Sequence, residues 1–407
     1  MNCRFCGKIL THDFIDLGCA PPSNAYLTDA DLNRPEVYYP LKLKVCTNCW
    51  LVQTEDYAGA EELFSTDYAY FSSTSSSWLE HARQYSQSIT RRLGLNAKSF
   101  VIEIACNDGY LLKNFVEGEI PCLGIEPTAN TAAAARNLGI PVLQEFFGQT
   151  LGRRLSDAGQ KADLIIGNNV YAHVPDINDF TIGLKTLLKP GGTITLEFPH
   201  LMRLIEHTQF DTIYHEHFSY LSLYNVMYIF RRAGLRVFDV EELATHGGSL
   251  RVYGCHLEDP RTDAETITSL LDEESSRGMR NLLLYQSFQV RADNAKNSFL
   301  QFLLDLKATG KTVAAYGAAA KGNTLLNYAG IKPDLLPYVA DRNPAKQGKF
   351  LPGSRIPIVS EDHIRVKQPD FIVILPWNIK EEVMAQLKYV REWDGRFVTA
   401  VPKLEVS

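Results

Sequence analysis

The sequence predicts an α/β protein built in three parts, and three observations support this fold class. Two Cys-x-x-Cys pairs lie near the N-terminus. Across residues 99–258, apolar runs of strand length alternate with helical segments, and a second alternation begins at residue 311. Such alternation indicates mostly parallel sheets with helices on both faces. We expect a small N-terminal domain (residues 1–70), a central α/β domain (71–262), and C-terminal helices leading into a second α/β domain (263–407).

The composition restricts the class of protein. The chain has 407 residues, of which 45% are hydrophobic and 22% charged, and its formal net charge is -6. A weakly acidic chain is not expected to have nucleic acid as its main partner. No apolar run approaches the roughly 20 residues that a membrane helix needs, and the start lacks the apolar stretch of a secretory signal. We expect a cytoplasmic protein with no membrane partner and, because no long heptad run is present, a monomer.

Four of the eight cysteines form two pairs, Cys3/Cys6 and Cys46/Cys49. Each pair can point two thiolates at one ion, and two pairs make a tetrahedral zinc site. A redox Cys-x-x-Cys would need only one pair and a thioredoxin-like context. Because four protein ligands leave no open coordination position, we expect the zinc to be structural. It would order a segment too small for a good core of its own.

The central domain is expected to hold a seven-stranded, Rossmann-like sheet. Its helices are predicted over 79–94, 109–118 and 128–139. The predicted strands cover 99–105, 121–127, 140–144, 162–169, 191–199, 235–242 and 249–258. No helix separates the last two strands, so we expect the last one to be antiparallel and to lie at the edge of the sheet.

The C-terminal part begins with amphipathic helices over 265–288 and 294–310. Residues 311–330 then predict a strand, a turn of small residues and a helix. Further strands are expected within 335–350, 370–378 and 396–404. This pattern predicts a second Rossmann-like domain.

The carboxyl ends of the central strands carry residues suited to binding a nucleoside, and open parallel sheets bind ligands at this edge. Glu126 ends the second strand and is placed to accept both hydroxyls of a ribose. The GxGxxG pattern that would cradle a pyrophosphate is missing, which favours a nucleoside without phosphates, such as S-adenosylmethionine. The candidate cofactor residues are Glu103, Asn107, Gly109, Glu126, Asn168 and Asn169.

Several long motifs occur in the order seen in a known family. They are the two Cys-x-x-Cys pairs, EIACNDGYLL, GIEPTANTA, NNVYAHVPD, YHEHFSY, HGGSLRVY and AYGAAAKGNTLLNY. Over nearly its whole length the chain resembles the sugar C-methyltransferases, which act on thymidine-diphosphate 4-keto-deoxysugars. The resemblance implies a structural zinc, a central class I methyltransferase domain that binds S-adenosylmethionine, and a nucleotide sugar between the domains.

The resemblance also implies roles for particular residues. His173, Tyr214, Glu216 and His217 would surround the sugar, and Tyr68 and Tyr70 would belong to a loop over the active site. The small-residue turn before Lys321 could approach a ligand closely, and Lys321 and Asn323 would contact the nucleotide sugar.

Methyl transfer to carbon needs a base that makes an enolate, a donor for the developing oxyanion, and a dry path to the methyl group. We expect His217 to be the base, with Tyr214 and His173 as donors or proton relays near the keto oxygen. Glu216 could fix an imidazole tautomer or bind the sugar. His215 is expected to be structural. His246, with its two following glycines, is interpreted as a tight turn that could lie near a ligand, and it is not among the candidate site residues.

Other interpretations stay open at this point. His215 and His217 could bind a metal only on a strand, and no third ligand is evident nearby. The cluster could also be a polar patch at the edge of a core. For the whole chain, the alternatives are an O- or N-methyltransferase acting on a nucleotide sugar, an NAD-dependent oxidoreductase or epimerase, and a non-catalytic zinc scaffold.

Overall fold

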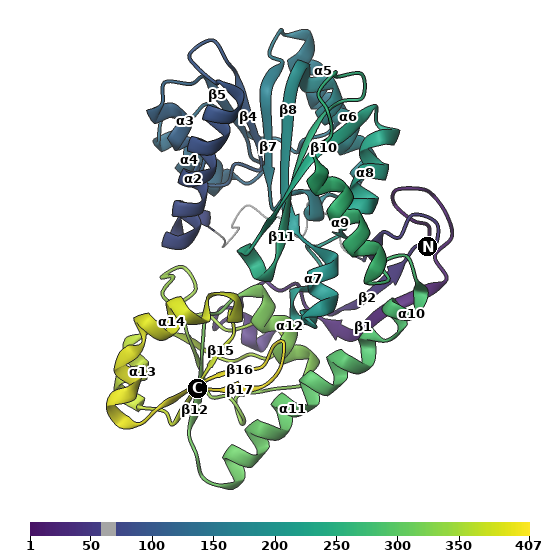
Figure 1. The fold of residues 1–407 in the computed structure, drawn as a ribbon. Coiled ribbons are helices and arrows are strands. Elements are labelled where there is room, and N and C mark those ends of the chain that lie inside the picture. Colours follow the sequence, from purple (N-terminus) through teal and green to yellow (C-terminus); the bar gives the residue numbers. More distant parts are fainter. Residues whose placement is uncertain (58–70) are drawn as a thin grey trace.

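The protein is described here by a computed structural model covering residues 1–57 and 71–407. In these residues the strands form three sheets, of four, seven and six strands. Figure 1 shows the seven-stranded and six-stranded sheets at opposite ends of the molecule, with the N-terminal strands beside the junction between them. The three-part α/β organisation predicted from the sequence is confirmed.

The N-terminal sheet is completed by a strand from the central domain. Its own strands, β1 (His12–Ala20), β2 (Tyr39–Val45) and β3 (Val52–Thr54), are antiparallel. The fourth strand, β9 (Ser219–Tyr220), pairs antiparallel with β3. Since β9 comes directly after the YHEHF sequence, this pairing ties the predicted catalytic residues to the N-terminal domain.

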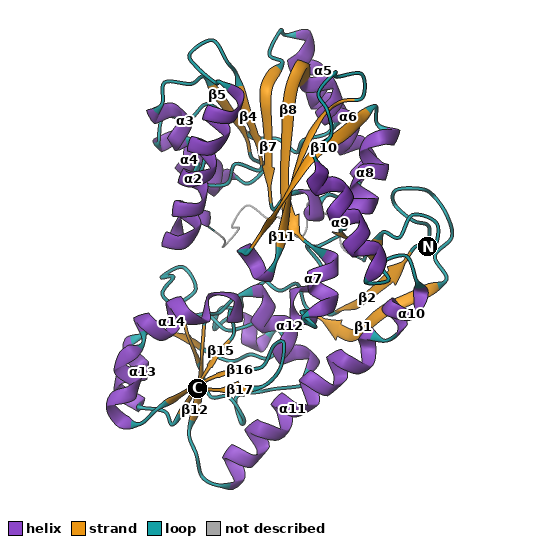
Figure 2. Cartoon of the chain, viewed as in Figure 1, coloured by secondary structure: helices purple, strands orange, loops and turns teal. Residues whose placement is uncertain are grey.

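The central sheet has the predicted seven strands. They are β4 (Val101–Ile104), β5 (Cys122–Ile125), β6 (Val142–Leu143), β7 (Ala162–Asn168), β8 (Leu188–Pro199), β10 (Leu235–Leu243) and β11 (Ser249–His256). Their order is β10-β11-β8-β7-β4-β5-β6. Every residue of β4 and β5 is buried, as expected for parallel strands that helices cover on both faces (Figure 2).

The prediction that the last strand lies at the edge of this sheet is wrong. β11 is antiparallel, as expected, but it lies between β8 and β10 and pairs with both. Helix α8 (Leu223–Arg232) carries the chain past the position next to β8, so β10 forms the edge. The hairpin then returns β11 into the gap, where it satisfies the hydrogen-bonding groups of two strands.

The helices of the central domain surround this sheet. Besides α8 they are α2 (Ser76–Leu93), α3 (Lys113–Glu117), α4 (Ala129–Asn137), α5 (Gln149–Asp157), α6 (Ile177–Leu187) and α7 (Leu201–Glu206). Helix α3 is shorter than the predicted 109–118, because Asn107 and Gly109 have positive φ angles and the chain turns before it becomes helical. Within the described residues, no helix is both long enough and apolar enough to cross a membrane.

The C-terminal helices differ from the prediction at their boundaries. They are α9 (Glu265–Ser276), α10 (Leu282–Gln286) and α11 (Phe288–Ala308). One continuous helix over 265–288 is therefore wrong. The chain turns at Gly278, whose φ is +80°, and the Asn281 side chain accepts a hydrogen bond from the Leu283 N–H to start α10.

The second α/β domain has a mostly parallel sheet in the order β14-β13-β12-β15-β16-β17. Its strands are β12 (Val313–Tyr316), β13 (Val339–Ala340), β14 (Ile358–Val359), β15 (Phe371–Ile374), β16 (Arg396–Thr399) and β17 (Glu405–Val406). Its helices are α12 (Ala320–Tyr328), α13 (Asp362–Lys367) and α14 (Lys380–Gln386).

Hydrogen bonds from three directions hold the histidine segment, which we define as residues 213–217, through Ile213 and through the adjoining residue Phe218. The hydroxyl of Thr324 on α12 donates to the Ile213 carbonyl at 2.7 Å. The Thr54 N–H, at the end of β3, donates to the Phe218 carbonyl at 3.2 Å. Within the central domain, the Phe218 N–H donates to the Ala172 carbonyl at 2.8 Å. The position of this segment therefore depends on all three domains.

Candidate active site

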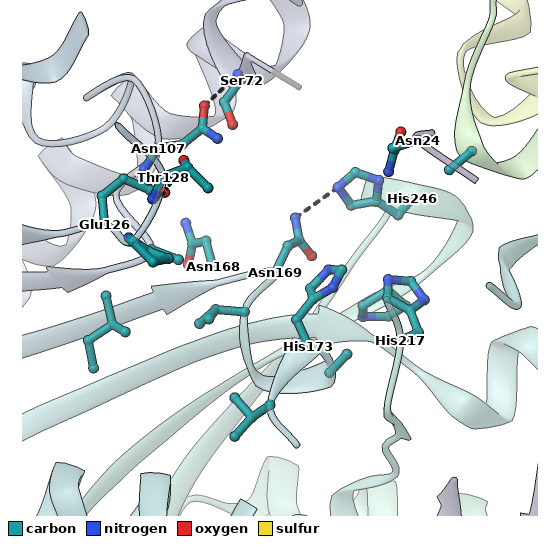
Figure 3. A pocket seen from close by; sticks show the side chains of 18 of the residues that line it. Asn24, Ser72, Asn107, Glu126, Thr128, Asn168, Asn169, His173, His217 and His246 are labelled. Carbon is teal, nitrogen blue, oxygen red and sulfur yellow. Dashed lines mark hydrogen bonds between the residues drawn. The ribbon is translucent and has the colours of Figure 1, made fainter. Parts of the chain in front are cut away.

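A cavity of about 400 Å³ lies at the carboxyl ends of the central strands, and residues of all three domains line it. Asn24 comes from the N-terminal domain, Glu126 from the end of β5, and Lys321 from α12. Figure 3 shows Glu126, Asn107 and Asn168 on one side of this cavity and His173, His217 and His246 on the other. The sequence prediction of a ligand site at this edge therefore coincides with a cavity.

The Glu126 carboxylate organises the cofactor side. It accepts hydrogen bonds from the N–H groups of Asn107 and Thr128, both at 2.9 Å, and from the Thr128 hydroxyl. These donors fix the carboxylate directly after the carboxyl end of β5, where it lines the cavity. An anchored acid at the end of this strand suits the two hydroxyls of a ribose.

A second set of hydrogen bonds joins residues 72–74 to the loop that contains Asn107 and Asp108. The Asn107 side-chain oxygen accepts from the Ser72 N–H at 2.9 Å, and Asp108 accepts from the Ser73 N–H at 3.0 Å. Ser72 also lines the cavity. No local sequence pattern indicates this contact, because it joins residues 35 positions apart.

Asn168 provides a test of whether a nucleoside fits. Its side-chain nitrogen and oxygen are both buried, and neither has a hydrogen-bond partner among the described residues. Leaving such atoms unpaired is costly, so a ligand with its own donors and acceptors would be stabilised there. Asn168, Asn107 and Glu126 therefore fit the nucleoside part of S-adenosylmethionine.

Glu103 and Gly109 lie behind this loop and do not line the cavity. Glu103 is fully buried, and burial together with the nearby Asp108 and Glu126 raises its pKa well above the usual value. At Gly109 the φ is +81°, and a Cβ atom would lie 2.5 Å from Ile140 Cδ1. Gly109 thus allows the tight turn to pack against the residues that follow α4.

Two imidazoles lie side by side in the cavity (Figure 3). The ring centres of His173 and His217 are 4.6 Å apart, and the ring centre of Tyr214 lies 4.0 Å from that of His217. His217 Nδ1 lies 2.9 Å from the Thr212 carbonyl, and His173 Nδ1 lies 2.7 Å from the Glu216 carbonyl. Because carbonyl oxygens only accept, both Nδ1 atoms carry the proton. In each neutral ring the lone pair is therefore on Nε2.

The surroundings keep both rings neutral. Burial lowers the pKa of His217 well below its usual value, and the neighbouring His173 and Lys321 lower it further. Burial also lowers the pKa of His173 to about 4. A neutral imidazole with a fixed tautomer can accept a proton near neutral pH.

Two further residues of the histidine segment, His215 and Glu216, do not line the cavity. The Glu216 side chain accepts a hydrogen bond from the Asn24 amide at 3.1 Å, and burial raises its pKa. His215 Nε2 lies 3.3 Å from the carbonyls of Tyr39 and Pro40. Both side chains therefore connect this segment to the N-terminal domain, and the tautomer of His173 is fixed by the main chain of Glu216 rather than by its carboxylate.

The predicted substrate residues are placed differently from one another. Lys321 lines the cavity, whereas Asn323 is buried outside it and donates to the Ser23 carbonyl at 2.6 Å. Tyr68 and Tyr70 lie outside the described residues.

His246 lines the cavity, although its sequence pattern predicted only a tight turn. Its φ of +55° agrees with a tight turn, and its ring nitrogen accepts from the Asn169 amide at 2.9 Å (Figure 3). Buried Glu197 supports the turn, since it accepts from the Thr245 hydroxyl and from Arg251. Burial and Lys321 lower the pKa of His246 to about 4. A histidine before two glycines was the available signal for a residue exposed to a ligand.

The four predicted metal ligands come together. The sulfur atoms of Cys3, Cys6, Cys46 and Cys49 all lie within 4.8 Å of one another. A tetrahedral site with Zn–S bonds of about 2.3 Å has sulfurs about 3.8 Å apart. The Cys3–Cys49 and Cys6–Cys46 separations are 3.6 Å and 3.5 Å, so the thiols fit zinc. Among the described residues no other group has metal-ligand geometry, which leaves a site at His215 and His217 without support.

Comparison with known proteins decides the family. Three family models match the chain in succession: "Putative zinc binding domain" over residues 3–64, "Methyltransferase domain" over 78–240, and "C-methyltransferase C-terminal domain" over 244–402. C-methyltransferase NovU of Streptomyces niveus is 33% identical over 405 residues, covering 100% of this chain and 96% of the relative. The chain belongs to the C-methyltransferase family.

Other similarities are more local. A ubiquinone biosynthesis O-methyltransferase of Brucella ovis is 26% identical over 92 residues, which are 22% of this chain and 37% of the relative. The chain also aligns with the crystal structure of the PH0226 protein from Pyrococcus horikoshii OT3. The alignment covers 46% of this chain and 95% of the PH0226 chain, with 13% identity and a TM-score of 0.38.

Membership of this family confirms the prediction of an enzyme that uses S-adenosylmethionine. It also confirms the zinc-binding domain, whose four cysteines the structure brings together. The interpretations as an NAD-dependent enzyme and as a non-catalytic scaffold gain no support from these comparisons.

Replacing Cys49 by Ser is expected to abolish stoichiometric zinc binding and to lower the rate of methyl transfer about 100-fold, because β3 would no longer hold β9 and the histidine segment in place. The affinity for S-adenosylmethionine should change by less than about 3-fold, since Asn168 ends a strand of another sheet and Glu126 directly follows one. Metal analysis, methyl-transfer kinetics and calorimetric binding measure these effects. Cys19→Ser, at an exposed cysteine, is the control. An unchanged rate without zinc would contradict this coupling.

Replacing Glu126 by Gln is expected to raise the Kd for S-adenosylmethionine by about 10-fold to 100-fold, the range for losing a hydrogen bond to a charged group. Isothermal titration calorimetry measures the change. The control is Glu117→Gln, at an exposed acid at the end of α3. Equal affinities in the two variants would show that Glu126 does not bind the cofactor.

Proposed function

We propose that this enzyme methylates the carbon next to the ketone of a thymidine-diphosphate 4-keto-deoxysugar. The observation that carries the proposal is the pair of neutral imidazoles, His173 and His217, in the same cavity as Glu126 and Asn168. A base is needed at this place because a carbon next to a ketone becomes nucleophilic only when it loses a proton. The motifs shared with sugar C-methyltransferases and the full-length similarity to NovU support the substrate class.

Residues of the central domain would hold the methyl donor. S-adenosylmethionine, when bound, supplies a methyl group on a positively charged sulfur. Glu126 would accept the ribose hydroxyls, and the unpaired amide of Asn168 would bind the base. Asn107 and Ser72 would close the loop over the nucleoside.

His217 is the proposed base. Its Nε2 takes the proton from the carbon, the C–H electron pair forms a carbon–carbon double bond, and the carbonyl π electrons move to oxygen. The enolate carbon would then take the methyl group that bound S-adenosylmethionine supplies, with the neutral thioether as the leaving group, and the ketone would be restored. His217 later returns its proton to solvent.

The tautomers divide the supporting roles. Neutral His173 uses its N–H toward the Glu216 carbonyl, so it presents an acceptor and suits a sugar hydroxyl or a proton relay. The hydroxyl of Tyr214 can donate to the keto oxygen. The nucleotide part of the substrate would lie toward the C-terminal domain, where Lys346 and the first residues of α12 line the cavity.

The proposed reaction predicts two linked activities. In deuterated water the wild-type protein should exchange the proton next to the ketone, and with S-adenosylmethionine it should add one methyl group. His217→Asn is expected to lower both rates by about 100-fold to 10,000-fold while cofactor binding is retained. Mass spectrometry of a panel of thymidine-diphosphate 4-keto-deoxysugars measures both rates.

The matched control is His207→Asn, at an exposed histidine outside the cavity. Methyl gain without proton exchange would indicate O- or N-methylation and would contradict the enolate step. If no sugar in the panel gains a methyl group although the cofactor binds, the proposed substrate class is wrong.

A further inference from the structure

Lys321 occupies a defined socket at the boundary between the C-terminal and central domains. Its ammonium lies 3.1 Å from the Asn378 side-chain oxygen, 3.5 Å from the His246 carbonyl, and 4.6 Å from the centre of the Trp377 ring. The side chain is partly buried and lines the cavity. Two neutral acceptors and an aromatic face orient this cation without neutralising it.

Asp211 supports the socket from the central domain. The Trp377 indole N–H donates to the Asp211 carboxylate at 2.6 Å, and Asp211 is fully buried. Trp377 also lies against the turn that carries His246, because a Cβ atom at Gly247 would come within 2.4 Å of the Trp377 ring. Trp377 is therefore fixed between Asp211 and the His246 turn, with Lys321 over its ring.

The charges of this group act on one another and on the imidazoles. Burial lowers the pKa of Lys321 to about 8, and Asp211 opposes that shift. Burial raises the pKa of Asp211 to about 6, while Lys321 and Trp377 act to lower it. The positive charge of Lys321 reaches the histidines, since it contributes to the lowered pKa values of His217 and His246.

The proposed reaction creates a negative charge on oxygen that needs a hydrogen-bond donor of its own. When His217 removes the proton, the charge develops on the keto oxygen. His217 then holds the proton it has taken from carbon, and neutral His173 presents a lone pair at Nε2, whereas an ammonium group presents only donors. Lys321 is placed in the same cavity and within electrostatic reach of His217.

We propose that the Lys321 ammonium stabilises the enolate oxygen, and that Asp211, acting through Trp377, is a positioning residue that holds Lys321 at that oxygen. This inference rests on the proposed function. It assigns to Lys321 a role in the proton-removal step in place of the diphosphate contact implied by the family resemblance. The ammonium donates a hydrogen bond and keeps its own proton, so His217 alone accepts the proton from carbon.

Lys346 offers a matched comparison. It lines the same cavity, but its ammonium donates to the Ala318 carbonyl at 2.8 Å and lies 5.3 Å from the centre of the Tyr26 ring. A residue that binds substrate and transition state equally changes KM, whereas one that acts on the enolate changes kcat. Substitution of Lys321 should therefore change kcat, whereas substitution of Lys346 should change KM.

The first test compares Lys321→Met with Lys346→Met on a thymidine-diphosphate 4-keto-deoxysugar that the wild-type protein methylates. Lys321→Met is expected to lower kcat and the rate of proton exchange by about 100-fold to 1,000-fold, the usual cost of losing an oxyanion donor. Its KM should stay within about 3-fold of wild type, while Lys346→Met should mainly raise KM. A raised KM with normal kcat and normal exchange in Lys321→Met would overturn the proposal.

The second test is the pH dependence of kcat. The ammonium acts only when protonated, so activity should fall as pH rises through about 8. Asp211→Asn removes a negative charge that favours the protonated lysine. The fall of kcat at alkaline pH, which we call the alkaline limb, should therefore move to lower pH. Lys321→Arg should abolish this limb, because a guanidinium does not titrate in this range. An alkaline limb that stays in place in both variants would overturn the proposal.

Trp377→Phe tests the positioning role. It keeps an aromatic ring beneath Lys321 but removes the N–H that Asp211 accepts, so the alkaline limb should move in the same direction as in Asp211→Asn. The control is Trp393→Phe, at an indole that donates to the Pro369 carbonyl and does not line the cavity. A uniform loss of activity with no shift of the limb would show that Trp377 is only structural, and would overturn this part of the proposal.

Failure of this inference is distinguishable from failure of the proposed function. If the wild-type protein neither exchanges the proton nor methylates any sugar in the panel, the proposed function is wrong and the role of Lys321 falls with it. If the wild-type protein does both and Lys321→Met keeps the wild-type kcat, only the role of Lys321 is wrong. Circular dichroism melting and S-adenosylmethionine binding establish that each variant is folded.

Discussion

Ser219 and Tyr220 of the central domain pair with β3 of the N-terminal sheet, directly after the histidine segment. The arrangement of the site depends on this pairing. A backbone fixed at its C-terminal end by a sheet, and at Ile213 by α12, leaves His217 little freedom to move. The zinc site therefore contributes at a distance: the cysteines order a small domain, and one edge of that domain fixes the segment that carries the proposed base.

Main-chain carbonyls, rather than carboxylates, orient the two imidazoles. A carboxylate next to an imidazole would favour its charged form and raise its pKa. A carbonyl fixes the tautomer with a much smaller effect of that kind, so burial is free to keep the ring neutral. The buried carboxylate of Glu216 instead bonds to Asn24, which joins the N-terminal domain to the cavity. This division explains how so many titratable side chains can lie within a few residues of one another.

Local patterns in the sequence predicted the elements, and long-range contacts determined what the sequence did not show. The alternation of strands and helices identified all seven central strands, and the cysteine spacing identified the metal ligands. The place of β11 was missed because pairing order depends on where α8 carries the chain. Asn24 and His246 were missed because a residue's entry into a cavity depends on packing between domains. Asn323 illustrates the reverse case, since it lies close to Lys321 in sequence yet bonds to Ser23 outside the cavity.

In this cavity, burial and neighbouring charges shift the pKa of Lys321 in opposite directions. Proton removal from carbon favours a dry site, but dryness disfavours every charge, including the cation that would stabilise the enolate. Burial alone would drive Lys321 toward its neutral form, and the anion of Asp211 opposes this through the shared indole of Trp377. With pKa values of about 6 for Asp211, about 8 for Lys321 and about 4 for His173, all three groups have the required charge between pH about 6 and about 8. A neutral acceptor and a charged donor can then coexist in one cavity, because main-chain carbonyls hold the imidazoles and Asp211, acting through Trp377, supports Lys321.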